Sequence, residues 1–232
     1  MHHTIQLVTL AFALTVSAPA QFHMPQLSHK EKTTKDDVSW LAPYASPEPD
    51  GRENDLVHDI RFRSFLRDHL KAPQTFWNEN QSLPDTVAEF LEVPGKVILD
   101  DNRFLSIDGC VPHFCPSRGL LFVDLGTAHP LIAFAAIDWT KDNKTPSQEG
   151  AEYTLWLFTN QPLNASAMTE ALKRTIARWT AQPSSDSNTL QNITNAILVD
   201  PDGTPHQTPP ATLGVYTVPL LNSQPASSEA KK

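Results

Sequence analysis

Cysteine is nearly absent from this sequence, which has only Cys110 and Cys115 among 232 residues. The two residues lie too close together to staple distant parts of a fold, and no second Cys or His pair follows at zinc-finger spacing. Glycine is scarce as well, with eight residues, and the chain has no phosphate-binding glycine loop, G-x-S-x-G or H-E-x-x-H motif. Nothing in the sequence therefore nominates a catalytic centre, and we expect no enzymatic activity, no bound metal and no cofactor.

Basic residues are also in short supply: 18 Lys and Arg stand against 26 Asp and Glu, which gives a net charge of −8. This balance argues against nucleic acid or an anionic membrane surface as partner and favours a basic partner. No apolar run in the sequence is long enough to span a bilayer, so we expect no membrane insertion.

The first 20 residues have the pattern of a secretory signal peptide. Residues 7–16 form a short apolar core, and Ala18-Pro19-Ala20 supplies an A-x-A cleavage pattern, although no Lys or Arg precedes the core. We therefore expect a periplasmic or secreted protein. An oxidising compartment would allow a disulfide between Cys110 and Cys115.

Three further regions complete the expected domain organisation. Residues 21–54 are polar and rich in proline, and their densest group of bulky apolar side chains lies at 40–44. This composition predicts a mostly disordered tether. Residues 55–218 are expected to form one α+β domain, and residues 219–232 a disordered tail.

The hydrophobic pattern predicts a helix at each end of the domain. An apolar stripe with helical spacing, which includes Phe62, Phe65 and Leu66, begins near residue 55 and ends before Pro73. Pro73 could then open a short helical turn. A second stripe predicts a helix over residues 165–181 that is capped by Asn164 and packs on the sheet.

Strands are expected between these helices. The pattern favours extended segments at 86–93, 96–99, 103–107, 119–125, 131–139, 152–159 and 193–199, with a last apolar segment at 213–221. Pro94-Gly95 and Asp100-Asp101-Asn102 suit tight reversals between the first three segments. The expected fold class is therefore α+β: an antiparallel sheet of about five or more strands, flanked by helices, with a hairpin loop closed by the cysteines.

The stretch Cys110-Val111-Pro112-His113-Phe114-Cys115 forms the tip of that hairpin. An oxidised pair would close a ring of about six residues and stabilise the chain by roughly 2 kcal/mol, so its effect is local. Pro112 would fix φ just before the histidine and limit how the imidazole is presented. Three interpretations remain: a trimmed surface hairpin with an ordinary histidine, a redox pair, which lacks the C-x-x-C spacing, and a zinc site, which lacks ligands.

Four carboxylates near turns and strand ends could form an acid–base pair if they met in a cleft. Their placement favours solvated or capping roles instead. They are Asp100, Asp101, Asp124 and Asp138.

Residues 103–115, with the Cys110–Cys115 stretch at their end, resemble the signature loop of the Ivy family, the inhibitors of vertebrate lysozyme, whose pattern is C-K-P-H-D-C. The neighbourhood is similar in order over about residues 56–158. It has a helix ending near Pro73, an aromatic turn at Phe76-Trp77, strands before the loop and an apolar strand after it.

The resemblance implies an antiparallel sheet flanked by helices and a loop that enters the lysozyme cleft, where the histidine engages the catalytic carboxylates. Carried over to this sequence, His113 is the blocking group, Pro112 supports it, and Cys110 and Cys115 hold the loop closed. The implied partner is a c-type lysozyme or a lytic transglycosylase-like muramidase.

Two loop positions depart from the family pattern. Val111 stands where the family has Lys, and Phe114 where it has Asp. Phe114 could instead anchor in an apolar subsite of a different muramidase. The alternative function is a non-inhibitory envelope binding module on the same scaffold, and the open edge of the expected sheet could also pair two copies as a homodimer.

Overall fold

A single seven-stranded sheet organises the domain. The computed structural model describes residues 37–45, 52–142, 144–146, 148, 150–185 and 188–216. The strands follow one another in chain order across the sheet, and every neighbouring pair is antiparallel except β5 and β6, which are parallel. They are β1 (Val93–Asp100), β2 (Phe104–Val111), β3 (Phe114–Asp124), β4 (Ile132–Trp139), β5 (Glu152–Thr159), β6 (Asn192–Val199) and β7 (Pro205–Thr208).

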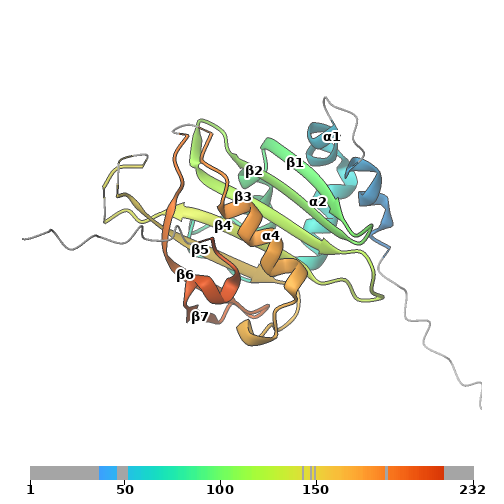
Figure 1. The fold of residues 1–232 in the computed structure, drawn as a ribbon. Coiled ribbons are helices and arrows are strands. Elements are labelled where there is room, and N and C mark those ends of the chain that lie inside the picture. Colours follow the sequence, from blue (N-terminus) through green and yellow to red (C-terminus); the bar gives the residue numbers. More distant parts are fainter. Residues whose placement is uncertain are drawn as a thin grey trace, which may run out of the picture. The chain divides into compact units, whose positions relative to one another are not determined.

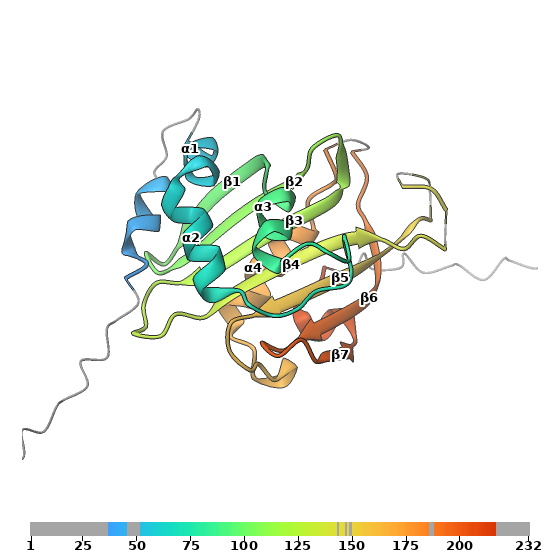
Figure 2. The same cartoon turned by 180° about the vertical axis from the view of Figure 1, so that it is seen from behind.

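Helices cover both faces of this sheet. Figure 2 shows α1 (Arg52–His58), α2 (Ile60–His69) and α3 (Leu83–Phe90) across one face. Figure 1 shows α4 (Glu170–Thr180), which connects the parallel strands β5 and β6, on the other. This arrangement confirms the predicted fold class. Three short 3-10 helices complete the elements: η1 (Ser39–Ala45), η2 (Ala165–Ala167) and η3 (Pro210–Leu213).

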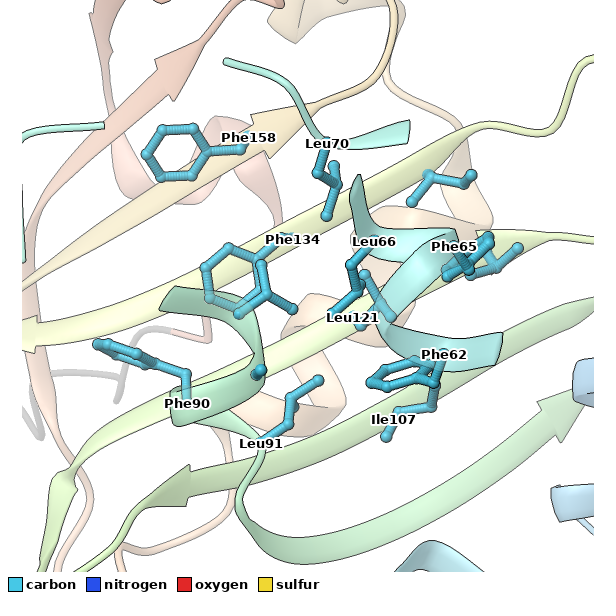
Figure 3. Close-up of a cluster of buried hydrophobic side chains, with 14 of the residues drawn as sticks. Phe62, Phe65, Leu66, Leu70, Phe90, Leu91, Ile107, Leu121, Phe134 and Phe158 are labelled. Carbon is cyan, nitrogen blue, oxygen red and sulfur yellow. The ribbon is translucent and has the colours of Figure 1, made fainter. Parts of the chain in front are cut away.

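The sheet separates two clusters of buried apolar side chains. The first lies against α1, α2 and α3 and contains Phe62, Phe90 and Phe134, which are labelled in Figure 3. The second lies against α4 and contains Leu172 and Ile176. The central strand β4 contributes side chains to both clusters, because successive side chains of a strand point to opposite faces of the sheet. Ile132, Phe134 and Ala136 join the first cluster, and Ala133, Ala135 and Ile137 join the second.

The segment 86–93 was predicted as a strand, and this prediction was wrong: most of it belongs to α3. The side chain of Ser82 caps the helix by accepting a hydrogen bond from the backbone of Asp85, and a proline lies in the first turn. Leu83, Val87 and Phe90 are all buried, with a spacing that fits one helix face. The apolar residues of this run therefore serve a helix that packs on the sheet.

Pro94-Gly95 was expected to reverse the chain but lies inside the edge strand β1. The register between β1 and β2 shifts between Pro94 and Val97, and the backbone N–H of Lys96 donates to the Asp108 carboxylate. This bulge absorbs the proline, whose missing N–H cannot serve a regular ladder. The second expected reversal is confirmed, since Asp101 and Asn102 both have positive φ between β1 and β2.

The helical predictions need three corrections. The first predicted helix is two helices, α1 and α2, separated at Asp59, whose side chain caps α2. Residues 71–82 form no helix, so the turn expected at Phe76-Trp77 is irregular backbone that is held by the side chain of Gln74. The C-terminal prediction began too early, because Asn164 caps η2 and a new cap, Thr169, starts α4.

Part of the expected tether is structured. Residues 39–45 form η1, in which Leu41 is fully buried and packs in the first cluster. For these residues the prediction of disorder was wrong, because the bulky apolar side chains at 40–44 pack in or against the first cluster. Residues 52–54, which were also expected to be disordered, belong to α1, so the prediction was wrong for them too. The predicted signal peptide, residues 21–36 and 46–51 of the tether and the predicted tail 219–232 lie outside the described residues.

Candidate functional site

The loop between Cys110 and Cys115 is the tip of the hairpin formed by β2 and β3. The last register pair is Val111 with Phe114, so Pro112 and His113 are the two turn residues. His113 has a φ of 59°, in the left-handed region, which costs a non-glycine residue about 1–2 kcal/mol. Proline at the first turn position and a positive φ at the second are the pattern of a type II turn.

A disulfide joins the two ends of this turn. The Cα atoms of Cys110 and Cys115 lie 4.9 Å apart, and both residues are buried. The pairing expected from the sequence is therefore present, and it closes a ring within one hairpin. His113, with its unfavourable backbone conformation, directly follows Pro112, and the ring closed by the disulfide contains both residues.

The side chains of the loop do not all point outward. Val111 is 5% exposed and belongs to the first cluster, and Phe114 is half-buried against the same cluster. His113 is exposed and Pro112 is half-buried. The two positions that depart from the Ivy pattern thus support the loop from inside, and the part of the loop that faces solvent is Pro112-His113.

An acidic hollow of about 360 Å³ lies beside the loop, bordered by Val111 and Pro112. The Glu89 carboxylate in it is fixed, because Trp77 Nε1 and Gln81 Nε2 both donate to its Oε2, at 3.1 and 2.8 Å. The remaining lining residues are Arg63, Gln81, Asp85, Ala88 and Glu92. Three carboxylates and one guanidinium therefore surround the hollow. The sequence did not indicate this hollow, because the run that forms most of α3 was predicted to be a strand.

Four carboxylates could have supplied an acid–base pair, but each of them contacts a different side chain. Asp100 and Asp101 do line one hollow of about 370 Å³, but Arg178 lies 2.8 Å from Asp100 and Arg174 lies 3.4 Å from Asp101. Two more ionic or polar contacts account for the others: Arg103 lies 2.7 Å from Asp124, and Ser117 Oγ donates to Asp138 at 3.0 Å. No two of them form a bridged carboxyl pair among the interactions of the described residues.

Burial shifts the pKa of three ionisable groups near the base of the loop. It raises the pKa of the Asp138 carboxyl, against the hydrogen bonds from Ser117 and the Trp139 backbone. Burial likewise raises the pKa of Asp108, which lies in β2, the same strand as Cys110. The pKa of Arg118 is lowered by burial, while the charge of Asp108 acts in the opposite direction. The base of the loop is thus a region of costly buried polar groups.

Two classes of site find no support in the part of the chain that the structure describes. There, no group of three or more His, Cys, Asp or Glu side chains could hold a metal ion. In the same residues, no helix has the length and apolar character that crossing a membrane requires.

Comparisons of the chain with protein-family models, curated proteins and solved structures found no match. The resemblance to the Ivy family therefore stays an expectation from the sequence of the loop and of the segments around it.

Proposed function

We propose that this protein is an exported inhibitor of a lysozyme or a related peptidoglycan-cleaving glycosidase, which it blocks by inserting the Cys110–Cys115 loop with His113 at its tip. The observation that carries the proposal is the presentation of His113. An exposed histidine occupies a costly left-handed position on a two-residue turn, and a disulfide closes that turn. Backbone strain of this kind persists only where the surroundings impose it and is concentrated at functional sites.

The chemistry of the target fits this presentation. Glycosidases of the lysozyme type act through two carboxyl groups that lie about 5–9 Å apart, depending on mechanism. An imidazole held between them can hydrogen-bond to a carboxylate and exclude the substrate. Because the turn, the proline and the ring fix the loop before binding, little conformational entropy is lost on insertion.

Charge supports a basic partner. The chain carries a net charge of −8, and Asp85, Glu89 and Glu92 border the hollow next to Pro112. Such a surface speeds encounter with a positively charged protein and disfavours acidic ones. The signal-like first 20 residues and the disulfide support export to the periplasm or the exterior, where peptidoglycan and its hydrolases meet.

A non-inhibitory envelope binding module remains the alternative, and one observation favours it. Val111 and Phe114, which replace the polar loop residues of the family, both pack inward. The loop therefore offers a target fewer polar contacts than the family pattern has.

The test is clearance of a cell-wall suspension by a c-type lysozyme and by a lytic transglycosylase, with and without the purified protein. We expect slower clearance by at least one enzyme. His113→Ala should weaken inhibition by about 1.5–3 kcal/mol, the loss of one hydrogen bond to a charged group. The matched control is His129→Ala, which removes another exposed histidine in the connection at the opposite end of β3.

Absence of inhibition at micromolar protein would favour the binding module. Equal inhibition constants for wild type and His113→Ala would show that another surface carries the inhibition.

A further inference from the structure

Three residues of β3, beginning with the disulfide-bonded Cys115, lie outside the regular ladder of the sheet. The pairing of β2 with β3 passes from Val111–Phe114 directly to Cys110–Arg118, and the pairing of β3 with β4 begins at Arg118–Ile137. Residues 115–117 thus have no register partner in either neighbouring strand. This stretch connects the loop to the regular part of the sheet.

Side chains from a distant segment hold the stretch instead. Gln191 Nε2 donates to the carbonyl of Pro116 at 2.6 Å, and Ser184 Oγ donates to the carbonyl of Cys115 at 3.3 Å. Both side chains belong to residues that are at least nine-tenths buried, with exposures of 8% and 3%. Figure 1 shows this orange segment, between α4 and β6, running beside the beginning of β3.

The segment is itself fixed to the sheet by Arg118. The guanidinium donates to the carbonyls of Trp179 and Gln182 at 2.9 and 2.8 Å, and to Gln191 Oε1 at 3.3 Å. The Gln191 amide therefore bridges the arginine of β3 and the carbonyl of Pro116. Its Oε1 accepts from the arginine while its Nε2 donates to the carbonyl, and a carboxylate, which only accepts, could not make both contacts.

We propose that Ser184 and Gln191 form a clamp that aims the disulfide loop, with Gln191 as its positioning residue. The disulfide fixes the shape of the loop, and the clamp fixes its direction relative to the sheet. The role of the clamp in target binding rests on the proposed function. In that function the loop enters a cleft, so it must point in the right direction before contact.

The test uses hydrogen exchange of the His113, Phe114, Cys115 and Ser117 amides in the free full-length protein, followed by NMR. Gln191→Glu keeps an acceptor for Arg118 but has no donor for the Pro116 carbonyl, and Gln191→Ala removes both contacts. We expect exchange at these amides to accelerate about tenfold in both variants, the factor that corresponds to one buried hydrogen bond. Gln182→Ala, which leaves the backbone carbonyl in place, should exchange like the wild type.

Unchanged exchange in both Gln191 variants would overturn the clamp, and so would uniform acceleration across the whole sheet, which indicates a merely structural role. Inhibition constants are measured in parallel, and we expect both variants to inhibit about tenfold more weakly, while thermal midpoints fall by about 2–4 °C, the shift expected from the loss of one buried hydrogen bond in a domain of this size. Faster exchange with unchanged inhibition would refute the role of the clamp in binding. If the wild type inhibits no muramidase, the proposed function fails, and the exchange measurement still decides the clamp.

Discussion

Gly109 of β2 and Gly119 of β3 are register partners, and the C-terminal end of α3 lies directly on both. A Cβ atom at position 109 would lie 2.8 Å from Leu91 Cα, and one at position 119 would lie 2.8 Å from Phe90 Cβ. Carbon atoms do not approach so closely, so neither position has room for a side chain. Two of the eight glycines therefore let α3 contact the sheet immediately beside the disulfide loop.

Gly119→Ala should lower the free energy of unfolding by about 1–3 kcal/mol, because the added methyl group forces the end of α3 away from the sheet. Urea denaturation followed by tryptophan fluorescence measures the change. An unaltered midpoint would mean that α3 can shift at no cost, and the close approach would then carry no energetic weight.

The Cys110→Ser, Cys115→Ser double variant tests what the ring contributes. The ring closes only a few residues, so the free energy of unfolding should fall by about 2 kcal/mol and the domain should remain folded. Inhibition should fall as well, since the left-handed His113 is no longer enclosed. Circular dichroism and inhibition constants measured on the same sample check both parts, and complete unfolding would contradict the local role of the bond.

Asp138→Asn tests the cost of the buried carboxylate. Because burial raises the folded-state pKa above the usual 3.8, the folded protein binds more protons than the unfolded chain just above that pH. The free energy of unfolding from this group therefore falls as pH rises through the raised pKa, and stays lower above it. The asparagine Oδ1 can still accept from Ser117 and the Trp139 backbone. The variant should thus be more stable than wild type at pH 7, with the difference shrinking toward pH 4.

Thermal midpoints of both proteins between pH 4 and 8 give the measurement. Asp101→Asn, at an exposed carboxylate that is 3.4 Å from Arg174, serves as the control and should follow the wild type. A constant difference between Asp138→Asn and wild type at every pH would show that the substitution acts through packing and not through charge.

Arg118→Met should cost about 3 kcal/mol in the free energy of unfolding. It removes the Arg118 donor to the Gln182 carbonyl and one of the two donors to the Trp179 carbonyl, which also accepts from the Gln182 backbone, and a buried acceptor that loses its partner is costly. The comparison variant is Arg174→Met, whose guanidinium forms an exposed pair and should contribute about 0.5 kcal/mol or less. Similar losses from the two variants would contradict the anchoring role of Arg118.

The sequence by itself determined the features that depend on neighbours within a few residues. The spacing of Cys110 and Cys115 around Pro112 defines a local ring, and Asp101-Asn102 supplies the left-handed turn between β1 and β2. Alternation along residues 152–159 fixed β5 because side-chain direction in a strand has period two. The α+β class followed from these local signals.

Tertiary structure decided the rest. The run 86–93 has apolar residues that suit either a strand or a helix, and the room that the glycine pair leaves on the sheet accommodates it as α3. The Ser82 cap is a local signal for this helix, and the strand prediction did not weigh it. The bond from Gln191 to Pro116 joins residues 75 positions apart, and no local pattern marks it. Sequence periodicity reports which face of an element is buried, but not which distant donor will meet a carbonyl that the ladder leaves without a partner. For this protein, local chemistry set the shape of the loop, and long-range hydrogen bonds set its direction.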